Sequence, residues 1–405
     1  MAKTIALLGA LDTKGAEYAF VKECIESLGH RTLLIDVGVM GEPALEPDVS
    51  RLEVAQAGGA DIAALRERAD RGEAMAAMTN GAAALLPRLY DEGKLDAVLA
   101  LGGTGGTAVA CAAMRTLPLG IPKVMVSTVA GGDVSGYVDV KDIVMIPSIV
   151  DVSGVNRISR EVFARAAGAV CGMADAIVPK GDDRPLIAAS MFGNTTPAVE
   201  HAKKLLEETG YEVLVFHCTG HGGRTLESLV EAGMIQGVLD LTTTEWADEL
   251  VGGVFSAGPT RLEAAARTGT PAIVTPACLD MVNFWAPDTI PARFEGRIFY
   301  PHNPNVTLMR TTVDECRELG RRMAKKLNLS TGPVTVLVPL KGWSMIDAEG
   351  GPFWLPEADA AWLKALNENV RDDIPVIELD CNVNDPVFAE HCAHELLGHM
   401  QRETA

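Results

Sequence analysis

Residues 4–37 read TIALLGALDTKGAEYAFVKECIESLGHRTLLIDV, and this stretch predicts a strand, a helix and a second strand. The aliphatic run at 4–9 ends in glycine, and apolar residues recur at helical spacing through 16–28. Gly29 ends the helix, and the run at 31–37 is again aliphatic. A strand, a helix and a strand in this order form a βαβ unit, which predicts an α/β fold with a parallel sheet.

Three more aliphatic runs extend this sheet, at 95–101, 122–128 and 142–148. Residues 41–80 carry little strand signal, and we interpret them as a loop and helices that follow the second strand.

The same pattern starts again after the linker-like run PKGDDRP. A strand is predicted at 185–193, a helix at 197–209 with Thr196 as its N-cap, and a strand at 211–220.

The repetition predicts two Rossmann-like, doubly wound parallel-sheet domains, 1–180 and 181–405. Residues 331–405 add two further strands and a closing helix to the second domain.

Composition excludes several classes of function. The chain has 405 residues, with 35 Lys and Arg against 54 Asp and Glu, a formal charge of −19 that argues against binding nucleic acid or an anionic membrane. The first apolar run is too short for a signal peptide or a membrane span. The eight cysteines are scattered singly, as reduced core residues are. We therefore expect a cytoplasmic location.

The strongest local signal is LGGTGGTAVACAAMRTL (101–117), directly after a predicted strand. Glycines let a ligand approach the backbone, and the helix that follows directs its free N–H groups and positive dipole end into the same space. The pattern predicts a phosphate cradle; the alternative is that the glycines only let strand and helix pack closely. The residues assigned to the cradle are Gly102, Gly103, Thr104, Gly105, Gly106 and Thr107, the two threonines as hydroxyl donors.

Asp12, Thr13 and Lys14 follow the first strand at the edge where open α/β sheets bind ligands. Lys14 is a candidate to neutralise a phosphate; the alternative is a helix cap followed by a solvated lysine. Asp36, at the end of the second strand, is a candidate to accept a hydrogen bond from a ribose hydroxyl.

The second half offers a second polar rim, around FHCTGHGGRTLESL (216–229). A histidine there could transfer protons near neutral pH, and an arginine could bind a carboxylate or phosphate, although a lone loop histidine is more often structural. The candidate catalytic residues are His221 and Glu245, and the candidate substrate-binding residues are Asn194, Thr195 and Arg224.

No metal site is predicted. His394 and His399 are five residues apart, so HExxH is absent and the two imidazoles do not share a helix face.

The chain resembles the uncharacterised protein family that includes the inhibitory amino-terminal region of a plant tobamovirus-resistance protein, a family described as ATP-binding. The strings that carry the resemblance are LDTKGAE (11–17), LGGTGGTA (101–108), VDVSGVNRIS (150–159), MFGNTTPAV (191–199), FHCTGHGGRTLE (216–227), AGPTRLEAA (257–265) and HNPNVTLMRTT (302–312).

The resemblance implies two Rossmann-like subdomains, a homodimer, and ATP on the first subdomain, with no established reaction. It places the phosphates on Gly102 to Thr107 and on the loop from Asp12 to Lys14, and the triphosphate is expected to carry Mg²⁺.

Two hypotheses follow. The first is a cytoplasmic ATP-binding protein. The alternative is a metabolic enzyme, a lyase, hydrolase or ligase, that acts on an anionic carboxylate or phosphate in the cleft between the domains. A nicotinamide-dependent dehydrogenase is weaker, because GxGxxG does not follow the first strand.

Overall fold

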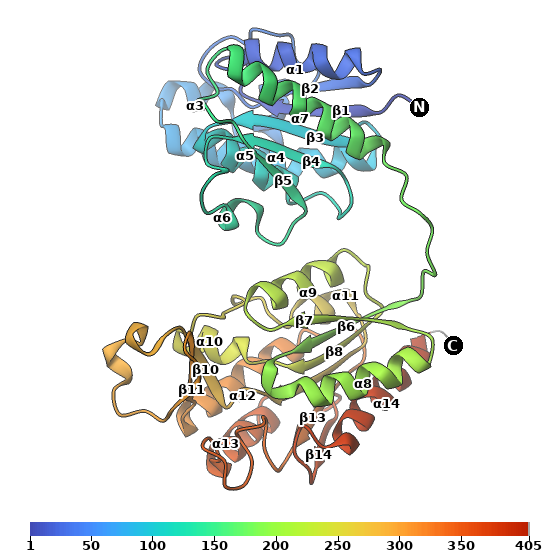
Figure 1. Ribbon diagram of the computed structural model, residues 1–405, viewed down its shortest axis with the longest axis vertical. Coiled ribbons are helices and arrows are strands. Elements are labelled where there is room, and N and C mark those ends of the chain that lie inside the picture. The colour runs from blue at the N-terminus through green and yellow to red at the C-terminus, as the bar shows by residue number, and fades with distance from the viewer. Residues whose placement is uncertain (404–405) are drawn as a thin grey trace. The chain divides into compact units, whose positions relative to one another are not determined.

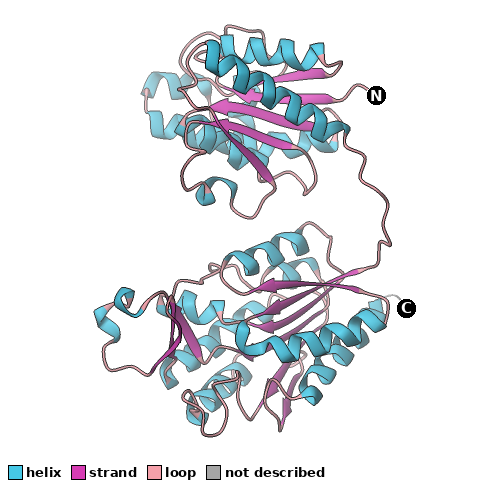
Figure 2. Cartoon of the chain, in the orientation of Figure 1, coloured by secondary structure: helices cyan, strands magenta, loops and turns pink. Residues whose placement is uncertain are grey.

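The computed structural model describes residues 1–403, and the chain divides into two compact units, Met1–Pro179 and Lys180–Ala405. The sequence prediction placed this boundary after residue 180. Each unit holds a sheet with helices on both faces (Figure 2). The predicted fold class, α/β with two Rossmann-like parallel-sheet domains, is confirmed.

Unit 1 contains a five-stranded sheet in the order β2-β1-β3-β4-β5, with every pair parallel (Figure 1). Its strands are β1 (Thr4–Gly9), β2 (Arg31–Asp36), β3 (Ala97–Gly102), β4 (Lys123–Ser127) and β5 (Ile143–Pro147). The central strands β1 and β3 are apolar and buried because helices cover both faces of the sheet.

The two faces of this sheet bury alternate residues of each strand. Ile5 and Leu7 pack against α1 (Gly15–Ser27) and α7 (Arg157–Asp175). Ala6 and Leu8 pack on the opposite face. The helices whose residues join that second cluster are α2 (Arg51–Ala57), α3 (Ile62–Arg68), α4 (Arg71–Asp91) and α5 (Thr104–Met114), and the short α6 (Ser135–Val138) follows β4.

The strand order of unit 1 reverses between β1 and β3. The chain runs outward from β1 to β2 on one side and from β3 to β5 on the other. In open α/β sheets the crevice beyond the carboxyl ends of such a strand pair is where ligands bind. The topology therefore directs attention to the loops that follow Gly9 and Gly102.

Unit 2 repeats this plan and extends it. Its six-stranded parallel sheet has the order β14-β13-β9-β8-β6-β7, so its first five strands follow the relative order of unit 1. The strands are β6 (Leu186–Met191), β7 (Glu212–His217), β8 (Gly237–Thr242), β9 (Ala272–Ala277), β13 (Val334–Pro339) and β14 (Val376–Leu379). An antiparallel sheet of β10 (Met281–Phe284), β12 (Val306–Arg310) and β11 (Phe299–Asn303) is inserted after β9.

Two sets of helices cover the main sheet of unit 2. One face carries α8 (Thr196–Glu208) and α14 (Pro386–Glu403). The other face carries α9 (His221–Glu231), α10 (Glu245–Val251), α11 (Ala264–Thr268), α12 (Val313–Leu327) and α13 (Pro356–Asn367). Short 3-10 helices lie at η1 (Gly193–Thr195), η2 (Pro287–Thr289) and η3 (Ala292–Phe294).

The predicted N-cap of α8 is wrong by one residue. Thr196 is the first helical residue and Thr195 is the N-cap, whose hydroxyl makes no capping hydrogen bond. That hydroxyl lies 2.8 Å from the Thr242 Oγ1 instead, because Thr195 is buried beside β8.

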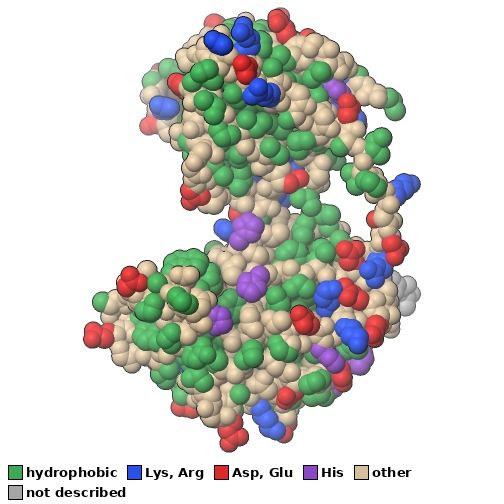
Figure 3. All heavy atoms as spheres, in the orientation of Figure 1, with side chains coloured by type: hydrophobic (Ala, Val, Ile, Leu, Met, Phe, Trp, Pro, Cys, Tyr) green, Lys and Arg blue, Asp and Glu red, His purple; other side chains and the backbone are tan. Residues whose placement is uncertain are grey.

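The distribution of surface charge and the state of the cysteines agree with what the composition predicts. On the face shown in Figure 3, acidic and basic side chains are interspersed on each unit rather than gathered into one basic patch. All eight cysteines are free thiols and seven are buried. Within residues 1–403, no helix has both the length and the hydropathy to cross a bilayer.

Candidate functional site

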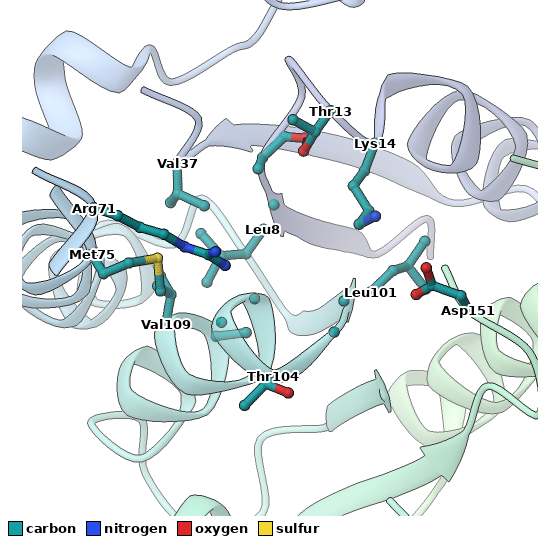
Figure 4. A pocket seen from close by; sticks show the side chains of 17 residues that line it. Leu8, Thr13, Lys14, Val37, Arg71, Met75, Leu101, Thr104, Val109 and Asp151 are labelled. Atoms are coloured by element: carbon teal, nitrogen blue, oxygen red, sulfur yellow. Dashed lines mark hydrogen bonds between the residues drawn. The ribbon is translucent and has the colours of Figure 1, made fainter. Parts of the chain in front are cut away.

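A cavity of about 420 Å³ opens at the carboxyl ends of β1 and β3, at the point where the strand order reverses. We call it the phosphate cavity. Glycines of the loop after β3 form its floor, and Lys14 and Arg71 reach toward it from other elements (Figure 4). The residues that line it are Leu8, Gly9, Ala10, Thr13, Lys14, Val37, Arg71, Met75, Leu101, Gly102, Gly103, Thr104, Gly105, Gly106, Val109, Ala110 and Asp151.

The fold itself does not require two of the four glycines in this loop. None of Gly102, Gly103, Gly105 and Gly106 is among the residues with positive φ. Close packing explains Gly102, whose added Cβ would lie 3.0 Å from the Cα of Gly106. An added Cβ on Gly103 or Gly106 would meet its nearest neighbour only at 3.8 or 3.7 Å, an ordinary contact. The glycines at 103 and 106 therefore leave space that the protein does not fill.

The first turn of α5 presents unpaired backbone N–H groups. Gly103 is the N-cap and carries no side chain to accept from them, and the first hydrogen bond of the helix runs from Thr107 N to Gly103 O at 2.9 Å. No residue of 1–403 accepts a hydrogen bond from the N–H of Thr104, Gly105 or Gly106. Such a helix terminus, with its positive dipole end, is an anion-binding group.

Two cationic side chains border the cavity. The Lys14 ammonium donates a hydrogen bond to the backbone oxygen of Val152. The side chain of Arg71, the first residue of α4, forms no ion pair or hydrogen bond with any residue of the described chain. Sequence reasoning missed Arg71, because it lies in the helical stretch 41–80 that carried no motif. Both cations favour the binding of a negatively charged ligand.

Asp151 is the one carboxylate among the residues that line the phosphate cavity. It is exposed, and its loop is held at the cavity because the carbonyl of the next residue, Val152, accepts a hydrogen bond from Lys14. The string VDVSGVNRIS contains it, but nothing local distinguishes this aspartate from an ordinary loop residue. A carboxylate beside an anion site can serve as a ligand for Mg²⁺.

The loop after β1 holds two of the predicted residues, Asp12 and Thr13. Asp12 accepts hydrogen bonds from the N–H groups of Met40 and Gly41 and so fastens the loop after β2. It does not line the phosphate cavity, but it borders a second cavity that adjoins it. Thr13 does line it, with an exposed side chain.

The structure corrects the predictions for Asp36 and Thr107, which are fully buried and cannot contact a ribose or a phosphate directly. The Asp36 carboxylate accepts from the N–H groups of Leu11 and Gly38, at 3.0 and 2.8 Å, and burial raises its pKa. The Thr107 hydroxyl bonds the Gly103 carbonyl and the Ser127 hydroxyl. Both residues hold the loops that shape the cavity.

The corresponding place in unit 2 is filled by protein. Where unit 1 has LGGTGG (101–106) at the end of its third strand and in the turn that follows, unit 2 has LTTTEW (241–246). Every one of these six side chains in unit 2 is buried. The duplicated fold therefore keeps an open glycine loop in one copy and a packed loop in the other.

Glu245, predicted to be catalytic, belongs to a buried ionic network around Arg261. The Arg261 guanidinium donates to Glu245 at 2.7 Å, to both oxygens of Asp240 at 2.5 Å and to Glu227 at 3.1 Å. Glu245 also accepts from the N–H groups of Gly220 and Gly223, at 2.9 and 3.0 Å. Its oxygens are occupied and out of solvent, so the structure corrects this residue to a structural role.

Asn194 and Thr195, predicted to bind substrate, are also buried. The backbone oxygen of Asn194 accepts from the Asn384 amide at 2.9 Å. His221 and Arg224 are exposed at the start of α9, and the His221 Nδ1 lies 3.4 Å from the Thr225 hydroxyl. Of the five residues predicted for the second rim, two are therefore accessible.

Comparisons with known proteins extend these observations. A protein from Clostridium tetani named "UPF0261 protein" is 50% identical over 405 residues, covering 99% of this chain and all of that protein. The ToMV resistance protein Tm-1(GCR237) of Solanum lycopersicum is 41% identical over 329 residues, which are 79% of this chain and 43% of the tomato protein. Among solved structures, a UDP-N-acetylglucosamine 2-epimerase from Rickettsia bellii covers 67% of this chain and 79% of its own at 13% identity, with a TM-score of 0.23, too low to support an argument.

The family matches span both units. Residues 3–179 match the N-terminal domain, and residues 184–400 the C-terminal domain, of the "Uncharacterised protein family (UPF0261)". The matches and the tomato relative confirm the resemblance inferred from the sequence strings, and the chain belongs to the uncharacterised protein family UPF0261.

Proposed function

We propose that unit 1 binds a nucleoside triphosphate, ATP, with its phosphates in the phosphate cavity. The observation that carries this proposal is the set of unpaired N–H groups at the start of α5, which border an open space at the point where the strand order reverses. The space that Gly103 and Gly106 leave open supports it independently.

The charges of the cavity suit a triphosphate accompanied by a metal ion. Lys14 and Arg71 supply two positive charges, fewer than the negative charges of a triphosphate. In phosphoryl-binding sites Mg²⁺ makes up the difference, held by one or two carboxylates together with phosphate oxygens. Asp151 is placed to be such a ligand; when bound, Mg²⁺ would neutralise phosphate charge, while Lys14 and Arg71 orient the phosphates.

Titration of the 405-residue chain with ATP and MgCl₂ in a calorimeter tests the proposal. Binding should also raise the melting temperature, because ATP at 100 times its dissociation constant stabilises the folded state by about 2.7 kcal/mol. Absence of both heat and a thermal shift at millimolar ATP would refute the proposal.

Asp151→Asn should remove most of the gain in ATP affinity that Mg²⁺ provides. With MgCl₂ we expect ATP to bind about tenfold more weakly, about 1.4 kcal/mol, because a charged ligand of the metal is lost. In EDTA we expect equal or tighter binding, because a negative charge beside the phosphates is removed. Calorimetry in both buffers measures the two effects. The matched control is Glu23→Gln, which changes an exposed carboxylate of α1 that does not line the phosphate cavity. Equal losses with and without Mg²⁺ would contradict the metal role.

A further inference from the structure

A second cavity of about 390 Å³ adjoins the phosphate cavity, and we infer that it receives the base of the nucleotide, a planar heteroaromatic group with an exocyclic amine. We call it the apolar cavity. The inference rests on the proposed function and deepens it, because it distinguishes a nucleotide from a simple polyphosphate. The volume falls within the range of small-molecule sites.

The two cavities form one continuous lining. Ala10, Thr13, Val37, Arg71 and Met75 border both of them. A ligand that extends from the start of α5 past Arg71 would enter the apolar cavity at the carboxyl end of β2. In Figure 4 the Arg71 and Met75 side chains lie on one side of the phosphate cavity, opposite Lys14 and Asp151. This geometry suits a ligand with a charged end and an uncharged end.

The chemistry of the lining suits an aromatic base. Nine of its fourteen residues have apolar side chains, and two of these, Met75 and Met78, carry thioethers, which make favourable contacts with aromatic rings. Leu65 and Met78, both nearly fully buried, form part of its wall. The carboxylates of Asp12 and Asp70 also border the cavity and disfavour a phosphate there. A sugar would match the apolar surface poorly, whereas a base would bury it.

Backbone polar groups at the end of β2 could recognise the edge of the base. No residue of 1–403 donates a hydrogen bond to the carbonyl oxygen of Val37 or Gly38, and none accepts one from the N–H of Val39. Neighbouring groups are engaged, since Asp36 accepts from the Gly38 N–H and Arg66 donates to the Val39 carbonyl. Two free acceptors and one free donor are what an amino group beside a ring nitrogen requires.

The test compares ATP with inorganic tripolyphosphate, which has the phosphates but no base. Ala74→Trp places an indole in the apolar cavity from α4, at a residue that does not line the phosphate cavity. We expect ATP to bind this variant at least about tenfold more weakly, the effect of losing about 1.4 kcal/mol of base contact, and tripolyphosphate to bind it within twofold of the wild type. The matched control is Ala76→Trp, at an exposed position of the same helix outside both cavities.

The outcomes separate this inference from the proposed function. If the wild-type chain binds neither ligand, the proposed function fails and the inference fails with it. If it binds both ligands equally, or if Ala74→Trp keeps the preference for ATP, the phosphate site stands and the base pocket is wrong. Photo-crosslinking of the wild-type chain with 2-azido-ATP is independent of any effect of the variant on folding. Labelled peptides from 37–41 or 65–78 would support the inference, and labelling confined to other segments would overturn it.

Discussion

Gly103→Val should abolish ATP binding while unit 1 still folds cooperatively. The wild-type residue has φ −81°, which valine can adopt, and the nearest atom to an added Cβ is 3.8 Å away, so the protein can accommodate the side chain. The isopropyl group would occupy the space that we assign to a phosphate and would keep it from the N–H groups of α5. We expect a loss of at least about 100-fold in affinity, about 2.7 kcal/mol or more. Calorimetric titration with ATP and MgCl₂ measures it.

Gly131→Val is the matched control for this substitution. Gly131 lies in another loop of unit 1, lines neither cavity, and has no atom within 4 Å of an added Cβ. It should bind ATP as the wild type does. Unchanged affinity in Gly103→Val, with an unchanged melting curve, would show that the phosphates do not lie on this loop.

Arg261→Met should greatly destabilise unit 2. The side chain is 1% exposed, and its removal leaves the buried carboxylates of Asp240 and Glu245, and the partly buried one of Glu227, without their common counter-ion. Breaking a buried ionic network in this way costs about 3–5 kcal/mol. All five tryptophans of the chain lie in unit 2, so urea unfolding followed by tryptophan fluorescence reports this unit selectively.

The loss of stability in Arg261→Met should grow as the pH rises. Burial raises the pKa of Glu245 and of Glu227, and the charge of Arg261 opposes that rise. Without Arg261 both pKa values should rise further, so the folded variant binds more protons than its unfolded chain, and its stability falls as the pH rises. The difference from the wild type should therefore be smaller at pH 5 than at pH 8.

Arg267→Ala serves as the control for charge removal. Arg267 pairs with Glu263, but the arginine side chain is largely exposed to solvent, and surface ion pairs contribute at most about 1 kcal/mol. A loss in Arg261→Met no greater than in this control would contradict the assigned role of the network. ATP binding by unit 1 should be unaffected in both variants.

Local patterns were sufficient to predict much of the fold. The aliphatic runs of β1, β3 and β6 and the Gly-terminated helices between strands were found because each signal lies within a few consecutive residues. The glycine loop after residue 101 was found for the same reason. The helices in 41–80 were predicted only as a group, and so Arg71 and Met75 of α4 could not be placed near that loop.

The errors concern residues whose role depends on distant partners. Asp36 follows a strand as a ribose-binding aspartate would, yet it bonds the N–H of Leu11, 25 positions away in the sequence. Glu245 was read as an accessible acid, yet Arg261 and two backbone N–H groups surround it. Burial by such partners determines whether a polar side chain faces a ligand or supports a loop, and no local pattern reports it.

The sequence by itself determined the α/β class, the duplication, the family and the loop on which a phosphate is expected, because periodicity, glycine spacing and the order of short strings are properties of neighbouring residues. Only the tertiary structure decided that the strand-order reversal is open in unit 1 and packed in unit 2, and that Arg71 and Asp151 border the open one. The physical reason is that a cavity is the volume left after side chains from segments far apart in the sequence have packed together. Local sequence patterns do not reveal which segments will meet.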